Sequence, residues 1–116
     1  MTVARPTGDD LVVMLAALAN PLRLRIVATL ANGPDYVSHL AREIGISRPL
    51  LHMHLQRLEA AGLIVGHLEL SDDGKAMKFY TVADFDLHLN ARVLAKAAKT
   101  LTKSDPEKGP ASKEKP

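Results

Sequence analysis

The chain of 116 residues contains no cysteine and no tryptophan, and its aromatic residues are two phenylalanines and two tyrosines. Without cysteine it has no disulfide framework, no thiolate zinc site and no cysteine nucleophile. No apolar run reaches the roughly 18 residues that a membrane-spanning helix needs, and the N-terminus lacks the pattern of a signal peptide. We therefore expect a cytoplasmic protein without a membrane partner, whose core is built from leucine, alanine, valine and isoleucine.

An excess of charge of one sign is also lacking. The chain has 15 basic and 13 acidic side chains, so any DNA-binding face must come from where the charges lie and not from their number. Residues 103–116 are mostly lysine, glutamate, proline and serine without apolar periodicity, which predicts a disordered tail. Residues 1–8 are expected to be a flexible arm. The remaining residues, 9–102, are expected to form one folded domain.

The N-terminal part of this domain is predicted to be helical. Leucines and alanines recur at helical spacing after Asp9 and Asp10, two acids that suit the positive end of a helix dipole. Asn20 can cap a second helix whose first residue is Pro21, where the missing N–H costs nothing. That helix is expected to end at Gly33.

The segment from Tyr36 to Gly62 has the pattern of a helix-turn-helix. A short helix over residues 37–44 is followed by Gly45, and Ser47 is a suitable N-cap for a longer helix. In such a motif the second helix enters the major groove of DNA, with its N-terminal residues against the base edges. This segment therefore carries most of the functional signal in the sequence.

After the fourth helix the apolar period changes. Residues 63–65 and 68–70 look extended, residues 71–74 have the composition of a turn, and residues 77–82 predict a return strand. This hairpin would supply a wing directly after the helix-turn-helix. A helical period resumes at Asp84. The predicted fold is mainly α (α+β), a winged helix-turn-helix with the order α-α-α-α-β-β-α.

The fourth helix is expected to bind DNA through its outward face, because Leu51, Leu55 and Leu58 form an inward stripe. Arginine can pair with guanine and glutamine with adenine, and a helix N-terminus can hold a phosphate. Lysines of the hairpin would contact the adjacent backbone, although Asp72 and Asp73 at its tip oppose this. The predicted DNA-binding residues are Ser47, Arg48, Pro49, Leu50, His52, Met53, Gln56, Arg57, Lys75 and Lys78.

The first and last helices are predicted to form a homodimer. Apolar residues of the last helix repeat at spacings of four and three, and on an isolated helix this seam would be left exposed. The first helix would add two leucines. The predicted interface residues are Leu11, Leu15, Leu87, Ala91, Leu94, Ala98 and Leu101.

Several of these segments resemble the ArsR/SmtB family of winged-helix repressors. Residues 17–26, which read ALANPLRLRI, are similar to the opening motif of that family. Further similar segments occur at residues 40–47, 54–64 and 74–80, so the resemblance covers about residues 9–102. It implies a homodimer that binds a palindromic operator in double-stranded DNA and, in many members, releases it on binding a metal ion.

The metal sites that the resemblance implies are only partly matched. The Cys-x-Cys site of the third helix falls at Tyr36 and Ser38, which excludes sensing by thiolates at that place. A second site, on the last helix, has its Asp-x-His half at Asp86 and His88, but its other half falls on a lysine and a threonine. Nickel or zinc is the expected ion, because carboxylate and imidazole suit both. The alternative is that His88 is an ordinary surface residue.

An enzyme is not expected, because no Ser-His-Asp arrangement, glycine-rich phosphate loop or HExxH motif occurs. His52 and His54 cannot share a helix face and are expected to face DNA or to be partly packed. The predicted function is a sequence-specific DNA-binding transcriptional regulator. Two alternatives stay open: a protein-interaction module that uses the exposed Leu50 and Met53, and a regulator controlled by a protein co-regulator and not by metal.

Overall fold

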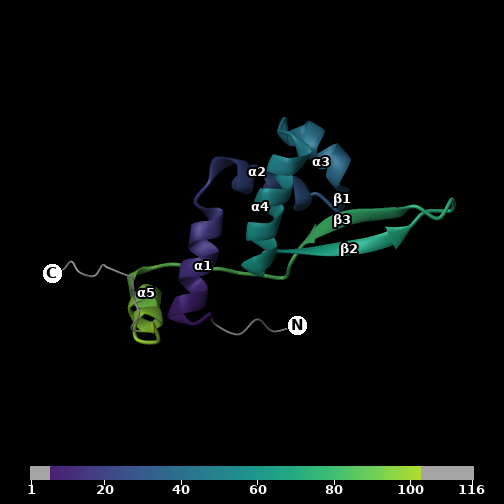
Figure 1. Ribbon diagram of the computed structural model, residues 1–116. Helices are drawn as coiled ribbons and strands as arrows, with labels where there is room; N and C mark the ends of the chain where they lie inside the picture. The colour runs from purple at the N-terminus through teal and green to yellow at the C-terminus, as the bar shows by residue number, and fades with distance from the viewer. Residues whose placement is uncertain (1–5, 103–116) are drawn as a thin grey trace. The chain divides into compact units, whose positions relative to one another are not determined.

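The computed structural model describes residues 6–102, which form two compact units: residues 13–86, and residues 6–12 with 87–102 (Figure 1). The predicted tail, and all but the last three residues of the predicted N-terminal arm, lie outside the described residues. Helix α1 (Gly8–Leu18) belongs partly to each unit.

The first unit, residues 13–86, contains the helix-turn-helix and the hairpin. Its remaining helices are α2 (Pro21–Leu30), α3 (Val37–Ile44) and α4 (Arg48–Ala60). An antiparallel sheet of order β1-β3-β2 is formed by β1 (Asp35–Tyr36), β2 (Ile64–Leu70) and β3 (Ala76–Val82). The predicted helices and hairpin of this unit are confirmed. The two-residue strand β1 was not predicted, because a segment so short shows no periodicity.

Local capping explains where α2 and α4 begin. The Asn20 Oδ1 accepts hydrogen bonds from the N–H groups of Leu22 (2.9 Å) and Arg23 (3.2 Å). The Ser47 Oγ accepts the Leu50 N–H at 3.3 Å in the same way. These side chains satisfy backbone donors that have no partner inside the helix.

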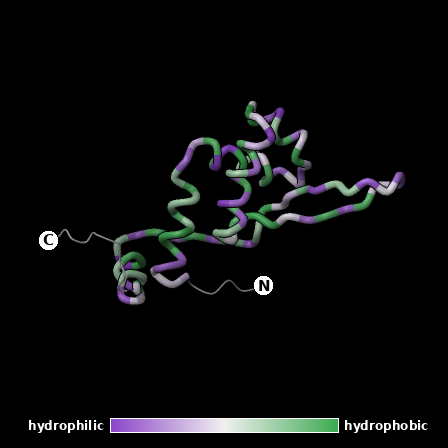
Figure 2. The backbone as a smooth tube through the Cα atoms, in the orientation of Figure 1, coloured by the Kyte–Doolittle hydropathy of each residue, from purple (hydrophilic) through white to green (hydrophobic). Residues whose placement is uncertain are grey.

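The core of this unit lies where α2, α3 and α4 meet the base of the hairpin. Figure 2 shows hydrophilic residues at the hairpin tip, and hydrophilic and hydrophobic residues alternating along the helices. The tyrosine of β3, Tyr80, is buried in the same cluster. The largest fully buried side chains are Ile26, Leu40, Leu51, Leu55, Leu58, Leu63 and Ile64.

The last helix, α5 (Ala91–Ala98), is shorter than predicted. Asn90 has an extended backbone, and its side chain accepts the Val93 N–H at 2.8 Å, so the helix cannot begin before residue 91. The prediction of a helix from Asp84 was therefore wrong for residues 84–90. Leu87 precedes the helix and Leu101 follows it, although both had been assigned to one helical seam.

In the second unit the start of α1 packs closely on the end of α5. The Gly8 N–H donates a hydrogen bond of 2.6 Å to the Thr100 Oγ1. A Cβ at Gly8 would lie only 2.3 Å from the Ala97 carbonyl oxygen, so glycine is needed for this approach. The Thr102 N–H reaches the Asp9 carboxylate at 3.2 Å.

Among residues 6–102 no single helix is long and apolar enough to cross a membrane. Only α1 and α2, taken together across the bend between them, are long and apolar enough in total for a membrane span.

Candidate nucleic-acid interface

Helix α4 has one buried face and one exposed face. Leu51, Leu55 and Leu58 are buried, as the apolar stripe predicted, and His54 joins them with 4% of its surface exposed. All the residues predicted to bind DNA lie outside this core, whether on α4, at its start or on the hairpin. The residues that the structure leaves exposed are Ser47, Arg48, Pro49, Leu50, His52, Met53, Gln56, Arg57, Lys75 and Lys78.

The two arginines of this face are available for a ligand. In the described part of the chain the ion pairs are those of His39 with Asp35 and Glu43, so neither Arg48 nor Arg57 is neutralised there. No acidic residue occurs between positions 48 and 58. Because a guanidinium offers donors in a planar fork that matches phosphate oxygens and the guanine edge, this face suits DNA.

The N-terminus of α4 has fewer free backbone donors than a typical helix start. Pro49 has no N–H, and the N–H groups of Leu50 and Leu51 are bonded to the side chain and carbonyl of Ser47. Among the described residues this leaves the Arg48 N–H without a partner in the first turn. A phosphate held at this terminus would therefore rely on Arg48 and the Ser47 hydroxyl more than on the helix amides.

A contact between the half-buried Arg23 and the buried His54 positions α4 against α2. The Arg23 Nε donates to the Ala17 carbonyl oxygen at 2.6 Å, and the Arg23 Nη1 lies 3.0 Å from the His54 Nδ1. Because a guanidinium can only donate, Nδ1 must be the acceptor and the imidazole is neutral. Burial, together with the positive charges of Arg23 and Arg57, lowers the pKa of His54.

Of the two outcomes expected for the histidine pair, His54 is packed and His52 is exposed. The sequence contained a signal for this difference. Residue 54 lies three positions after Leu51 and four before Leu58, which puts it on the core stripe of the helix.

The base of the wing places one predicted lysine over an aromatic ring. The Lys78 ammonium lies 5.4 Å from the centre of the Tyr80 ring. On the neighbouring strand a Cβ at Gly66 would come within 2.9 Å of the Lys78 side chain and 3.0 Å of the Tyr80 ring. Glycine at position 66 therefore leaves room for the lysine stem beside the Tyr80 ring.

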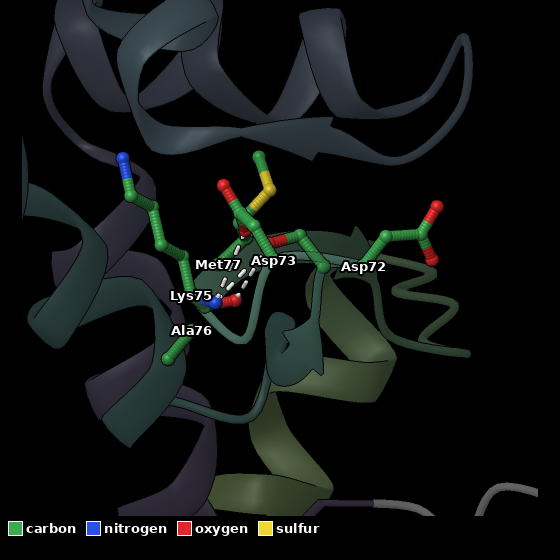
Figure 3. Close-up of a pocket in the computed structure, with 6 residues that line it drawn as sticks. Asp72, Asp73, Lys75, Ala76 and Met77 are labelled. Carbon is green, nitrogen blue, oxygen red and sulfur yellow. Dashed lines mark hydrogen bonds between the residues drawn. The ribbon is translucent and has the colours of Figure 1, made fainter.

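The tip of the wing is a tight turn that carries charges of both signs. Its residues line a shallow pocket (Figure 3). The Asp73 carboxylate accepts hydrogen bonds from the Ser71 hydroxyl and from the Lys75 N–H, which lower the pKa of Asp73 in that order. Figure 3 shows the Lys75 ammonium and the Asp72 carboxylate on opposite sides of the turn. Lys75 can therefore face a phosphate while Asp72 points elsewhere.

One face of the sheet carries a polar and aromatic cluster that the sequence did not reveal. The Tyr36 hydroxyl donates to the Glu69 carboxylate at 2.6 Å, and this bond raises the pKa of Tyr36. The His67 ring stacks on Phe79 with centroids 4.8 Å apart, and its Nε2 lies 2.9 Å from the Thr81 hydroxyl. His67 is therefore held by the hairpin.

The predicted metal ligands Asp86 and His88 are both exposed and precede α5. Among residues 6–102 no group of three or more histidine, aspartate or glutamate side chains is arranged to hold a metal ion.

The residues of the predicted dimer seam are exposed on α5 but buried or half-buried on α1. No residue of α5 is buried, and Leu94 keeps 44% of its surface exposed. Leu11, by contrast, is 5% exposed. Its place in an intersubunit seam stays a prediction, although little of the side chain is left exposed for a partner. Leu15 is half-buried.

Residues 20–65 match the sequence profile described as "Bacterial regulatory protein, arsR family". A helix-turn-helix-type transcriptional regulator of Methanocaldococcus jannaschii is 33% identical over 87 residues, which cover 75% of this chain and 90% of that protein.

Two solved structures are similar in fold and sequence. Reduced HlyU from Vibrio cholerae matches with a TM-score of 0.57 and 26% identity, over 79% of this chain and 85% of that one. A DNA-binding domain from Mycobacterium bovis, described as a homodimeric winged helix-turn-helix of a possible ArsR-family regulator, has a TM-score of 0.55 and 25% identity, over 78% and 74%.

Proposed function

Because the chain belongs to the arsR family of bacterial regulatory proteins, which are DNA-binding transcriptional regulators and not enzymes, we propose that it binds a palindromic operator as a homodimer. In this proposal α4 enters the major groove, and the β2–β3 hairpin lies against the adjacent sugar–phosphate backbone. The observation that carries the proposal is the exposed, unneutralised basic face of α4, set on a helix whose other face is fixed in the core.

The structure of α4 supports this role in two ways. Its position is held by three buried leucines and by the contact between Arg23 and His54, so its outward side chains start from a rigid support. Those side chains combine charge with hydrogen-bonding groups at helical spacing. Arg48 and Arg57 suit phosphate or guanine, and Gln56 suits adenine.

The proposed homodimer is supported by the apolar surface of α5. No side chain of this eight-residue helix is buried, and Leu94 on α5 and Leu101 just after it remain about half exposed. Covering this surface with a second copy would remove it from water. Two α4 helices related by a two-fold axis would read half-sites about one helical turn apart, which is why the operator is expected to be palindromic.

Selection from a library of random DNA duplexes tests this function directly. We expect an inverted repeat to be enriched, and the affinity of the full-length protein for it to fall steeply as salt rises, because phosphate contacts release counterions. Arg48→Ala and Arg57→Ala should each weaken binding by about 1–3 kcal/mol if they reach bases. Arg25→Ala, an exposed arginine on α2, is the matched control and should bind as the wild type does.

The alternative, a winged-helix module that binds another protein, makes the opposite prediction. No duplex would be enriched, and retention on DNA would not depend on Arg48 or Arg57. Enrichment of a single half-site without a repeat would leave DNA binding intact but would contradict the dimer.

A response to nickel or zinc through Asp86 and His88, and control by a protein co-regulator, stay predictions from the sequence. The donor types suit either ion. With two such residues in each chain, a four-ligand site would need both subunits or further ligands.

A further inference from the structure

The exposed face of α4 is not uniformly polar. Leu50 and Met53 expose 38% and 44% of their surfaces, and Pro49 is exposed beside them. Positions 50 and 53 are three residues apart and therefore neighbours on the helix surface. Neither side chain can donate a hydrogen bond, and only the weakly accepting sulfur of Met53 can accept one. These residues would gain nothing from a phosphate and would lose from burying a polar base edge.

The surroundings of this apolar pair favour DNA over protein as its partner. Arg48 and Arg57 are both exposed on α4, near the two ends of the helix, and no acidic residue lies between them. A polyanion is complementary to that face. The surface that these two side chains expose is also far smaller than the roughly 800 Å² that each partner buries in a stable protein interface.

The major groove offers one apolar group on its base edges, the C5-methyl of thymine. We propose that Leu50 and Met53 contact thymine methyl groups and thereby make A·T pairs a specificity determinant of each half-site. This inference rests on the proposed function of α4 as the recognition helix.

Gln56 strengthens the same preference. It follows Met53 by three positions, so the two side chains are neighbours on the exposed face. A glutamine amide can pair with the N6 and N7 atoms of adenine, while the methyl of the paired thymine lies on the opposite strand of the same groove. One short stretch of the helix can therefore recognise both members of A·T pairs.

A G·C pair at such a position would be disfavoured. It lacks the methyl group and presents the cytosine amino group, whose donor would be buried against leucine or methionine without an acceptor. Replacing thymine by uracil removes the methyl alone and keeps the pairing. Burial of one methyl-sized group corresponds to about 0.8 kcal/mol, which is roughly a fourfold change in affinity for each methyl.

The test uses the full-length protein and the duplex enriched by selection. Each thymine is replaced by deoxyuridine in turn, and dissociation constants are measured for the wild type, Leu50→Ala and Met53→Ala. Leu24→Ala is the control variant, because Leu24 is 54% exposed but lies on α2. A uracil placed outside the half-sites is the control duplex. Thermal unfolding of each variant verifies folding.

We expect at least one thymine in each half-site at which uracil weakens wild-type binding about fourfold. Substitution in both half-sites should weaken it about sixteenfold. Met53→Ala or Leu50→Ala should abolish the penalty at its own thymine, whereas Leu24→Ala should keep it. Strong binding with no uracil penalty, or a penalty unchanged in both α4 variants, would overturn the inference and leave the proposed function intact. Failure to select any duplex would overturn both.

Discussion

Stability should depend on pH through His54, the histidine buried between α4 and α2. Its imidazole is neutral in the folded protein, because the Nδ1 accepts from Arg23 at 3.0 Å, and burial lowers its pKa below the ordinary value of 6.5. Below pH 6.5 the unfolded chain therefore binds a proton that the folded chain does not take up. The free energy of unfolding contributed by this site is complete above pH 6.5 and falls as the pH drops toward the folded pKa.

Two substitutions separate the hydrogen bond from the titration. In His54→Leu an apolar side chain joins the buried leucines, but the Arg23 Nη1 loses its acceptor. An unpaired donor in a buried position costs about 1–3 kcal/mol. We expect His54→Leu to lower the free energy of unfolding by about 1–2 kcal/mol at pH 8. This is the lower part of that range, because Arg23 is only half-buried and keeps its bond to Ala17. His54→Gln retains an acceptor and should lose less.

The assay is urea unfolding between pH 5 and pH 8 at one fixed protein concentration, because dimerisation would make stability depend on concentration. Both variants should lose the part of the pH dependence that His54 contributes. His52→Gln, on the exposed face of the same helix, should keep the wild-type profile. A His54→Gln profile that still parallels the wild type would refute a neutral, buried His54 as the source of the pH dependence.

The remaining predictions concern the dimer and the effector. Leu94→Asp should yield monomers that bind DNA poorly, because a single half-site supplies only part of the affinity, and light scattering that still shows a stable dimer would place the interface elsewhere. Lys99→Asp, on exposed residue 99, is the control for the added charge and should stay dimeric. Calorimetric titration with nickel and with zinc should show binding that His88→Ala weakens; equal affinity would remove His88 from the site, and no heat in either protein would remove metal sensing.

Local chemistry made most of the first unit predictable from the sequence. Asn20 and Ser47 cap the helices that follow them, and Gly45 ends α3 with a φ of +83°, a conformation that glycine adopts without strain. The core stripe of α4 was predictable for the same reason, because helical periodicity decides which positions share a face. Each of these signals acts within four residues along the chain.

The tertiary structure decided the features that depend on residues far apart in the sequence. β1 exists because Asp35 and Tyr36 pair with Tyr80 and Phe79, and Leu11 is left with only 5% of its surface exposed. The start of α5 is instructive, since the Asn90 cap was a local signal that the apolar repeat from Leu87 concealed. A periodic pattern shows which residues could share a helix, but the capping bond determines where that helix begins.

The sequence by itself determined the order of the helix-turn-helix and hairpin and the candidate recognition face. The structure determined the chemical state of His54, the point at which α5 begins and the surface that α5 leaves uncovered. The physical reason is the range of the interactions. Caps, turns and periodicity are settled between near neighbours, whereas burial, and with it the pKa of a side chain and the surface left for a partner, depends on everything that packs around a residue.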